Sequence, residues 1–397
     1  MEHFTILIFW ILTGLVMYTY LGYPVILFVL VKGKRILFPE TKRSLPEALP
    51  EVTLLIPAHN ESSLIEEKMQ NCLALDYPSS LLKILWITDG STDETPQMLV
   101  TYPGVTVLHQ PERKGKTAAM NRAMQWVDTP LVIFTDANTL LNKEAIKEMV
   151  RCFSDPQTAC VAGEKRIRME STSDAASSGE GLYWKYESTL KKWDSQLAGA
   201  AGAAGELFGI RTKLFEPMPE DTLLDDFVLS LRLVIRGYRI TYCPEAYAME
   251  WASENVAEEE KRKVRIAAGG IQSVTRLSPL LNPFRFGLFS FQYISHRVLR
   301  WTLAPWALFI LLPINAYILC IKPSLYIYQV AFTFQILFYA LAMAGKISAS
   351  KQIRNKFLFV PYYFLFMNWS VIKGLFYLFH RKDRSGAWVK ARRKVQA

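Results

Sequence analysis

Cysteine is scarce in this chain of 397 residues, which has only five. They are Cys72, Cys152, Cys160, Cys243 and Cys320. No two of them form a C-x-x-C pair, and the scattered spacing excludes a disulfide framework or a zinc site built on cysteine pairs. We expect reduced packing residues in a cytosolic environment. Internal repeats and low-complexity tracts are also absent, so the length allows one large domain or two smaller ones.

Acidic residues are fewer than basic ones. The chain has 36 Asp and Glu and 46 Lys and Arg, which gives a net charge of +10. The basic residues cluster beside long apolar runs, so anionic lipid headgroups match them better than nucleic acid does. With 51% hydrophobic residues, the composition indicates lipid-embedded segments. The 10 Trp, 18 Tyr and 23 Phe suit membrane-interface belts as well as protein cores.

The first apolar run, Phe4–Val31, is long enough to cross ~30 Å of hydrocarbon as a helix. No basic region precedes it and no small-residue cleavage site follows it, so it does not resemble a signal peptide. Basic residues follow directly, and they are Lys32, Lys34, Arg35, Lys42 and Arg43. The positive-inside rule therefore places the amino terminus outside and the residues after 32 in the cytoplasm.

The carboxyl-terminal part again contains segments that are expected to lie in or on the membrane. Pro283–Arg300 mixes Phe, Arg, His and Tyr as an interfacial amphipathic helix would. Trp301–Ile321 and Leu325–Ala344 are two membrane spans joined by a short turn. Phe357–Phe379 has basic residues on both flanks, and both flanks favour the cytoplasm. This last segment is therefore expected to lie along the membrane or to re-enter it, which leaves the basic tail 380–397 in the cytoplasm.

Residues 50–275 form the soluble unit, in which short apolar runs alternate with helical stretches. The predicted strands are 52–56, 84–88, 105–108, 131–134 and a closing one at 239–243. This alternation predicts an α/β fold with a mostly parallel, doubly wound sheet. Past Gly163 the alternation stops, and helices are expected over 182–197, from Asp225–Asp226 onward, and over 258–265.

The strand at 131–134 ends in Thr135–Asn138, where Asp136 and Asn138 carry oxygen atoms two residues apart. Ligands of open α/β sheets bind just beyond the carboxyl ends of the strands. Oxygen ligands at this spacing suit a hard divalent cation and the phosphates that it carries. The alternative is an Asx turn in which Asn138 caps the next helix.

Other charged residues fall on the same predicted edge of the sheet. Asp89 follows the second strand, and its carboxylate can accept hydrogen bonds from a base N–H or a ribose hydroxyl. Lys116, preceded by Arg113 and Lys114, supplies positive charge for a diphosphate at a helix start. Asp226 lies at another helix start and can serve as a general base, with a helix cap as the alternative. Asp225, one residue earlier, is expected to face elsewhere.

A glycine-rich stretch, Gly199–Gly205, is placed where backbone could approach a ligand closely. Trp184, Tyr186 and Trp193 precede it at helix-like intervals. Trp184 or Trp193 could hold a sugar by stacking. The alternative is that these aromatic residues only pack and that the glycines form a tight turn.

Five short stretches follow one another in a fixed order along the soluble unit. They are Ile56–Glu61, Thr88–Asp93, Gly115–Lys116 with Asn121, Thr135–Asn138 and Leu224–Asp226. Together they resemble the ordered motifs of inverting family 2 glycosyltransferases, and the similarity is greatest to the membrane-embedded branch of cellulose, hyaluronan and poly-N-acetylglucosamine synthases. The resemblance covers about residues 50–275, and the flanking membrane helices fit that branch.

This resemblance implies a GT-A nucleotide-sugar domain flanked by transmembrane and interfacial helices, with Asp226 as the base that deprotonates the acceptor hydroxyl. Asp89 and Glu61 would contact uridine, and Asp136 the ribose and diphosphate. The donor-binding residues that we expect are Pro57, Asn60, Glu61, Asp89, Lys116 and Asp136. The acceptor-binding residues that we expect are Trp184, Gly205, Asp225 and Arg265. Asp136 and Asn138 would hold Mg²⁺ or Mn²⁺.

The sequence departs from the family pattern in two places. Asn138 stands where members usually carry a second Asp, and its amide can bind a metal ion only without a charge. Processive members carry Gln-x-x-Arg-Trp on a late helix, whereas Arg262–Ile266 keeps Arg265 and lacks both Gln and Trp. In those members the Trp stacks on the acceptor sugar, so single sugar transfer is better supported here than synthesis of a long polymer.

The function that these features indicate is a membrane-bound inverting glycosyltransferase in polysaccharide or glycolipid synthesis. It would use a nucleotide sugar, with UDP as the nucleotide, and a saccharide or lipid-linked acceptor, in contact with membrane lipids and not nucleic acid. We expect an integral protein of the bacterial inner membrane with its catalytic domain in the cytoplasm. The alternatives are a membrane protein that binds nucleotide sugars without transfer and a hydrolase with paired carboxylates.

Overall fold

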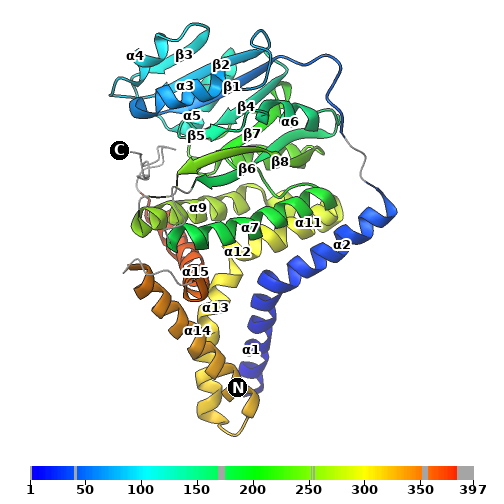
Figure 1. Cartoon of the computed structure of the whole chain (residues 1–397). Helices are drawn as coiled ribbons and strands as arrows, with labels where there is room; N and C mark the ends of the chain where they lie inside the picture. Colours follow the sequence, from blue (N-terminus) through cyan, green and yellow to red (C-terminus); the bar gives the residue numbers. More distant parts are fainter. Residues whose placement is uncertain are drawn as a thin grey trace.

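The computed structural model describes residues 2–39, 43–168, 175–251, 253, 255–350 and 356–381. An α/β domain lies above a layer of long helices, and a bundle of apolar helices extends away from that layer (Figure 1). Along the chain, an apolar helical segment comes first, the α/β domain follows, and further apolar helices come last.

In the described residues, the sheet has eight strands in the order β3-β2-β1-β4-β7-β6-β8-β5. The first half is parallel and consists of β1 (Val52–Ala58), β2 (Leu82–Asp89), β3 (Val105–Gln110) and β4 (Leu131–Thr135). The second half consists of β5 (Thr139–Leu141), β6 (Thr158–Arg168), β7 (Leu207–Arg211) and β8 (Arg239–Trp251). β7 is antiparallel to β4 and to β6, and β5 is antiparallel to β8.

β6 is parallel to β8, so four of the seven pairings among the described strands are parallel. The prediction of a mostly parallel sheet is therefore correct, although the antiparallel pairings of β5 and β7 make the sheet mixed. The sequence analysis missed β5, β6 and β7 and found only the first five residues of β8. The outer part of β6 carries Glu164 and Lys165, which are buried and paired with side chains of neighbouring elements. A charged residue in a sequence predicts a surface position. The two buried charges therefore obscured the pattern of a buried strand at β6.

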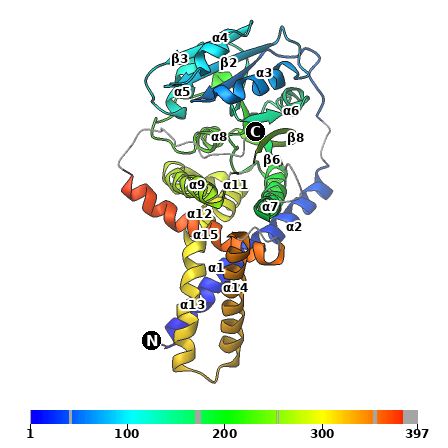
Figure 2. The same cartoon turned by 60° about the vertical axis from the view of Figure 1, so that its left-hand side comes forward.

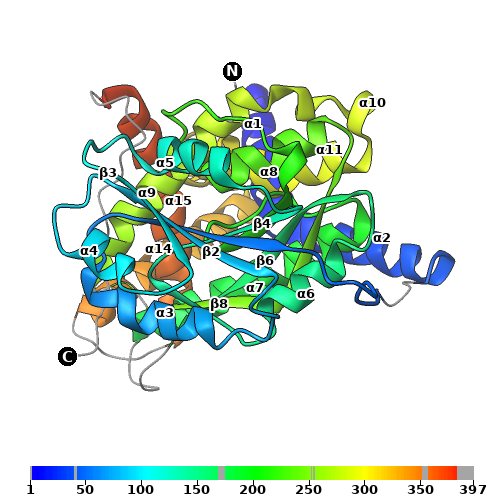
Figure 3. The same cartoon turned by 90° about the horizontal axis from the view of Figure 1, so that it is seen from above.

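Helices cover both faces of the sheet. Successive side chains of a strand point to opposite faces, so Leu55 of β1 packs in one core and Leu54 and Ile56 in the other. The first core includes α5 (Lys116–Ala123) and α8 (Asp225–Ile235), and the second includes α3 (Ile65–Leu73) and α6 (Ala145–Cys152). Figure 3 shows these two pairs of helices on opposite sides of the strands.

A helical layer lies below the sheet and includes α7 (Ala175–Leu197), α9 (Val256–Arg276) and α11 (Leu288–Tyr293) (Figure 1). The expectation of one interfacial helix over Pro283–Arg300 is wrong in detail. This segment begins as α10 (Pro283–Phe286), breaks at Gly287 with φ 54°, and continues through α11 and a π-helical turn to α12 (Leu299–Trp301). Its polar residues Ser290, Gln292 and His296 are fully buried against the rest of the domain.

Three helical segments in the described residues are long and apolar enough to cross a membrane: Glu2–Leu37, Leu303–Ile321 and Tyr326–Ala349. The first comprises α1 (Glu2–Met17), a π-helical turn and α2 (Tyr23–Leu37), and the other two are α13 (Leu303–Ile321) and α14 (Tyr326–Ser350). In Figures 1 and 2, α1, α13 and α14 run together away from the sheet, whereas α2 diverges along the helical layer.

The last helix, α15 (Lys356–His380), is not among these candidate spans. It packs tightly on α9, since a Cβ added to Gly374 would lie 2.7 Å from the Cβ of Ala267. Lys373 also pairs with Glu260 of α9 at 2.5 Å. Figure 2 shows α15 passing across the junction between the bundle and the helical layer.

Candidate active site

A cleft of about 260 Å³ lies between the carboxyl edge of the parallel strands and helices α7, α8, α9 and α15. We call it the active-site cleft. Seven residues that the sequence predicts as functional line it: Lys116, Asp136, Trp184, Gly205, Asp225, Asp226 and Arg265. They come from positions spread over 150 residues of the chain, and the fold brings them around one space.

Lys116 is the central cation of the active-site cleft. It is the first residue of α5, because Gly115 before it turns the chain with φ 97°. Its ammonium lies 2.7 Å from Oδ1 of Asp136 and 3.8 Å from Oδ2 of Asp225. Burial lowers its pKa, but these carboxylates outweigh that effect and raise the pKa above its usual value. Lys116 is therefore a permanent positive charge at the strand edge.

Asp226 lies beside Lys116 in the first turn of α8. Gly205 separates the two side chains, since a Cβ added there would lie 3.4 Å from Lys116 Nζ and 3.5 Å from Asp226 Oδ2. A glycine at 205 thus keeps the space between them open. Burial raises the pKa of Asp226 to about 7, with Asp225 adding to the rise and Lys116 opposing it. A carboxyl group that titrates near neutral pH is well suited to proton transfer.

Asp225 also lines the active-site cleft, so the expectation that it faces elsewhere is wrong. Two consecutive residues can both reach the cleft because they occupy the first turn of α8, where the helix end points into it. Asp225 Oδ2 is buried and accepts no hydrogen bond from the described residues. Arg265 of α9 lies in the same region, where burial lowers the pKa of its guanidinium and the charge of Asp225 opposes this shift.

The remaining predicted donor residues organise the loops at the strand edge and do not line the active-site cleft. The Asp89 carboxylate accepts hydrogen bonds from the amides of Lys114 at 3.0 Å and Gly115 at 2.6 Å. It therefore fixes the turn that presents Lys116. Asn60, at φ 53°, accepts a hydrogen bond from the Thr92 amide at 2.8 Å, which ties the first loop to the second. The contact of Asp89 with uridine stays a prediction.

Two other predicted residues sit close to these loops. The Glu61 amide donates to Thr95 Oγ1 at 2.9 Å, and the residue is buried. Pro57 is buried within β1, past Leu55, where the pairing of β1 with β4 ends. Proline has no N–H to give to a sheet, and although Pro57 is still aligned with Ile87 of β2, the pairing on the β4 side has already ended.

Asn138 lies in the turn between β4 and β5 and is partly exposed. A strand follows it rather than a helix, so the alternative of a helix-capping Asn138 is wrong. The buried Lys68 side chain stabilises this turn. Its ammonium donates a hydrogen bond to the Thr139 carbonyl at 2.6 Å and lies 3.2 Å from Thr135 Oγ1. The sequence analysis missed Lys68, although it shares a helix face with the buried residues Ile65 and Cys72.

The described residues contain no cluster of three or more His, Cys, Asp or Glu side chains able to hold a metal ion on their own. The carboxylates in and around the active-site cleft are instead paired with lysine and arginine side chains. Lys165 pairs with Glu206 at 2.7 Å and with Glu250, which also binds Arg262 at 2.9 Å. These ion pairs were not predicted, because the partners lie on β6, on β8, on α9 and in the loop before β7, and only the fold brings them together.

The two tryptophans that could stack on a sugar have different surroundings. The Trp184 ring lines the active-site cleft and has the ammonium groups of Lys165, Lys191 and Lys263 within 5.5 Å of its centre. Trp193 packs against Phe28 with ring centres 5.3 Å apart, so the packing alternative holds for it. A third ring, Trp301, lines the cleft together with Ile266 and was not singled out from the sequence.

Comparison with known proteins shows which proteins this chain is similar to. Residues 53–218 match the family described as Glycosyl transferase family 2. The poly-β-1,6-N-acetyl-D-glucosamine synthase of Staphylococcus aureus is 29% identical over 240 residues, which is 58% of this chain and 57% of that protein. The corresponding synthase of Staphylococcus epidermidis is 26% identical over 235 residues, 57% of this chain and 56% of that one. The chain thus spans a little over half the length of these curated relatives.

Among solved structures, a mannosyltransferase from Pyrobaculum calidifontis in complex with GDP-Man and Mn²⁺ superposes with a TM-score of 0.68. It is 22% identical, and the match covers 95% of this chain and 100% of that one. The prediction of a Rossmann-like GT-A domain with apolar helices on both sides is confirmed at the level of the fold.

Proposed function

We propose that this chain, in which residues 53–218 form a family 2 glycosyltransferase domain, is a membrane-bound inverting glycosyltransferase in polysaccharide or glycolipid synthesis. It would move a sugar from a UDP-linked donor to a saccharide or lipid-linked acceptor. The observation that carries the proposal is the placement of Asp226, with a pKa of about 7, beside the permanent cation Lys116. A protein that only binds nucleotide sugars has no need of a carboxyl group tuned in this way.

The reaction has one displacement step. The acceptor hydroxyl oxygen attacks the anomeric carbon as Asp226 takes its proton, and the bond from that carbon to the diphosphate oxygen breaks on the opposite face. The anomeric configuration is inverted, and the nucleoside diphosphate leaves with the bonding electrons. Lys116 faces the developing charge on the diphosphate, and preorganised cations of this kind lower such barriers. Asp89 holds the turn that places Lys116.

A divalent cation fits the same edge. Asp136 and Asn138 lie in one partly exposed turn and offer a carboxylate and an amide oxygen, which are ligands for hard cations. These two residues would hold Mg²⁺ or Mn²⁺. The ion would neutralise part of the diphosphate charge.

Release of UDP from UDP-sugars, measured with and without acceptor, tests the proposed function. We expect acceptor-dependent release with at least one donor of a panel of UDP-hexoses and UDP-N-acetylhexosamines. Release that ignores every acceptor would indicate a hydrolase, and binding without any release would indicate the non-catalytic alternative.

Metal dependence is our first detailed prediction. Excess EDTA should abolish transfer, and Mn²⁺ or Mg²⁺ should restore it in preference to softer metals. Asn138→Asp adds a second anionic ligand, so the metal concentration needed for half-maximal activity should fall or stay the same. A titration of activity against free metal measures this, with Asn142→Asp, past β5, as the matched control. Full activity of the unmodified chain in EDTA would remove the metal from the mechanism.

Our second prediction concerns the length of the product. Because Ile266 stands where processive members have Trp, we expect short products or a single addition. Sizing of products made from a radiolabelled donor measures this under conditions where each acceptor meets one enzyme. A ladder of high polymer from single encounters would contradict the prediction and would assign acceptor stacking to Trp184 or Trp301.

Our third prediction concerns membrane topology. We expect the amino terminus outside the cell and the catalytic domain and the tail in the cytoplasm. The structure supports one part of it, because Glu2 at the start of α1 pairs with Lys322 in the α13–α14 turn at 2.9 Å. These two points therefore lie on the same side. In a Cys320→Ser background the other native cysteines are buried. An impermeant maleimide should then label Ser324→Cys in intact cells and not Ser385→Cys. Efficient labelling at 385 would mean that α15 crosses the membrane.

A further inference from the structure

A second cavity, larger than the active-site cleft, lies next to it. It has a volume of about 410 Å³, which is within the range of ~300–1,000 Å³ typical of small-molecule sites. Its wall is formed mainly by apolar and aromatic side chains of the bend between α1 and α2, of α7, of α12 and of α15. We call it the apolar cavity.

The apolar cavity and the active-site cleft share part of their walls. The shared residues are Glu187, Arg297, Trp301, Met367 and Val371. Trp301 also links the apolar cavity to the base, because its ring packs edge-on against Phe227 with centres 5.0 Å apart. Phe227 is the residue after Asp226. A ligand that lay in the apolar cavity would therefore extend directly toward Asp226.

The far end of the apolar cavity lies at the level where the bundle meets the helical layer. Leu21 and Val360 line it and are 57% and 50% exposed. Leu21 belongs to the first candidate membrane span, and Val360 to α15, which crosses the top of the bundle (Figure 2). Exposed apolar residues at this level would face the edge of a bilayer, so a lipid tail can reach the apolar cavity without crossing water.

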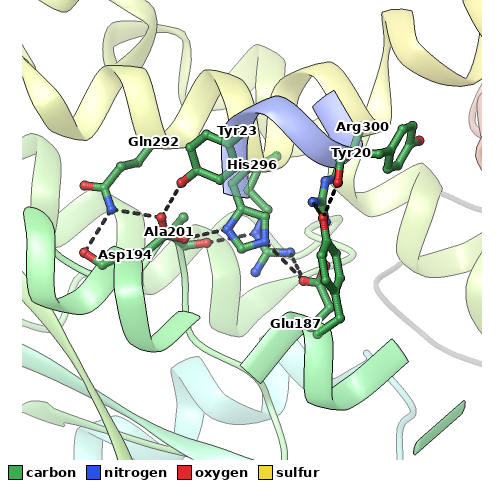
Figure 4. A network of polar contacts seen from close by, with 10 residues as sticks. Tyr20, Tyr23, Glu187, Asp194, Ala201, Gln292, His296 and Arg300 are labelled. Carbon is green, nitrogen blue, oxygen red and sulfur yellow. Dashed lines mark hydrogen bonds and ion pairs between the residues drawn. The ribbon is translucent and has the colours of Figure 1, made fainter. Parts of the chain in front are cut away.

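The shared wall carries buried positive charge. Glu187 receives hydrogen bonds from Arg300 at 2.5 Å, from Arg297 at 3.3 Å and from Nε2 of His296 at 3.2 Å (Figure 4). Nδ1 of His296 contacts Asp194 at 2.5 Å. The two ring nitrogens of His296 therefore face two different carboxylates, Nε2 that of Glu187 and Nδ1 that of Asp194.

Two guanidinium groups and one imidazole thus meet two carboxylates at the junction of the two spaces. The pKa of Glu187 is well below its usual value because the charges of His296 and Arg300 outweigh its burial. Glu187 therefore stays ionised and holds Arg297 and Arg300 in place at the junction. Planar guanidinium groups at such a site recognise phosphate well.

We propose that the apolar cavity binds the tail of a lipid phosphate, with its phosphate at Arg297 and Arg300, and that this lipid is the acceptor or carries it. The inference rests on the proposed glycosyl transfer and names its acceptor class. The hydroxyl or sugar beyond the phosphate would then enter the active-site cleft beside Asp226. The chemistry of the wall, apolar at one end and cationic at the junction, matches an amphiphile with an anionic head.

Photo-crosslinking of the full chain in detergent micelles tests this, with a diazirine-tagged polyisoprenyl phosphate as the probe. Mass spectrometry should place the crosslinks on α15 near Val360 and on the bend near Leu21. Unlabelled polyisoprenyl phosphate should compete at least about tenfold better than the corresponding alcohol or phosphatidylglycerol, a difference of about 1.4 kcal/mol in binding free energy. Equal competition by phosphatidylglycerol would make this a site for bulk membrane lipid and would overturn the proposal.

Two variants sharpen the test. Val360→Trp fills the apolar cavity at a half-exposed position and should reduce crosslinking by about tenfold. Its control is Phe376→Trp, on the same helix, 53% exposed and outside both spaces, which should crosslink normally. Arg297→Gln should remove the preference for the phosphate over the alcohol. Unchanged crosslinking in Val360→Trp would overturn the proposal.

The same samples separate this inference from the proposed function. If UDP is released in the presence of a water-soluble saccharide and the probe does not bind, the lipid site is wrong and glycosyl transfer stands. If the probe binds as described and no donor releases UDP with any acceptor, the lipid site stands and the proposed function is wrong.

Discussion

Replacing Asp226 with Asn is expected to lower the rate of glycosyl transfer by about 10²–10⁴-fold, the usual contribution of a positioned general base. This corresponds to about 3–5 kcal/mol of activation barrier. An acceptor hydroxyl is a poor nucleophile until its proton begins to leave, and the Asn amide cannot accept that proton. The amide keeps the shape of the side chain, so folding and donor binding should be retained. Transfer per folded molecule and UDP-sugar affinity are the two measurements.

The matched control for this change is Asp221→Asn. Asp221 pairs with Arg276 at 2.6 Å, does not line the active-site cleft, and should keep normal turnover. The turnover of Asp225→Asn should lie between the two, because Asp225 lines the cleft and contacts Lys116 at 3.8 Å but is not the proposed base. If Asp226 acted only as a helix cap, its variant would lose stability and keep its turnover. Near-normal turnover of a well-folded Asp226→Asn protein would therefore exclude the catalytic assignment.

The part of the site at the parallel strands was predictable from the sequence. β1, β2 and β4 are buried on both faces, so they read as continuous apolar runs, and each run ends abruptly in polar residues. The ends of parallel strands gather at one edge of a sheet, which is why Asp89 and Asp136 could be placed there without coordinates. Asp226 could be singled out because an acidic pair stands at the start of an apolar helix.

The part below the sheet was not predictable. Glu187 and His296 are 109 positions apart, and nothing in the sequence near either residue indicates that one would be the partner of the other. His296 reads as one polar residue of an amphipathic segment, although it is fully buried. The apolar cavity has the same origin, since four helices from distant parts of the chain enclose it. Packing between elements, rather than local pattern, creates both features.

Lys116→Gln is expected to have the second-largest effect, because it removes a cation that contacts both Asp136 and Asp225. Loss of a single preorganised group that stabilises developing charge typically costs about 10²–10³-fold in rate. The glutamine can still reach Asp136 with a neutral amide, so the turn before α5 should be kept. Transfer at saturating donor and metal measures the loss, with Lys114→Gln as the control. The Lys114 side chain pairs with Glu112 on the surface, outside the active-site cleft.

The pH dependence of this variant separates a charge effect from a structural one. Asp226 must be ionised to accept a proton, so transfer by the unmodified protein should be half-maximal near pH 7 and level off above about pH 8. Lys116 lowers the pKa of Asp226, and its removal should move this rise upward. An opposite charge within ~4–6 Å typically shifts a carboxyl pKa by about 1–3. The Lys116→Gln profile should therefore be half-maximal only at about pH 8 or above, while Lys114→Gln keeps the original profile. A lower rate with an unshifted profile would mean that Lys116 acts on the diphosphate alone and does not tune the base.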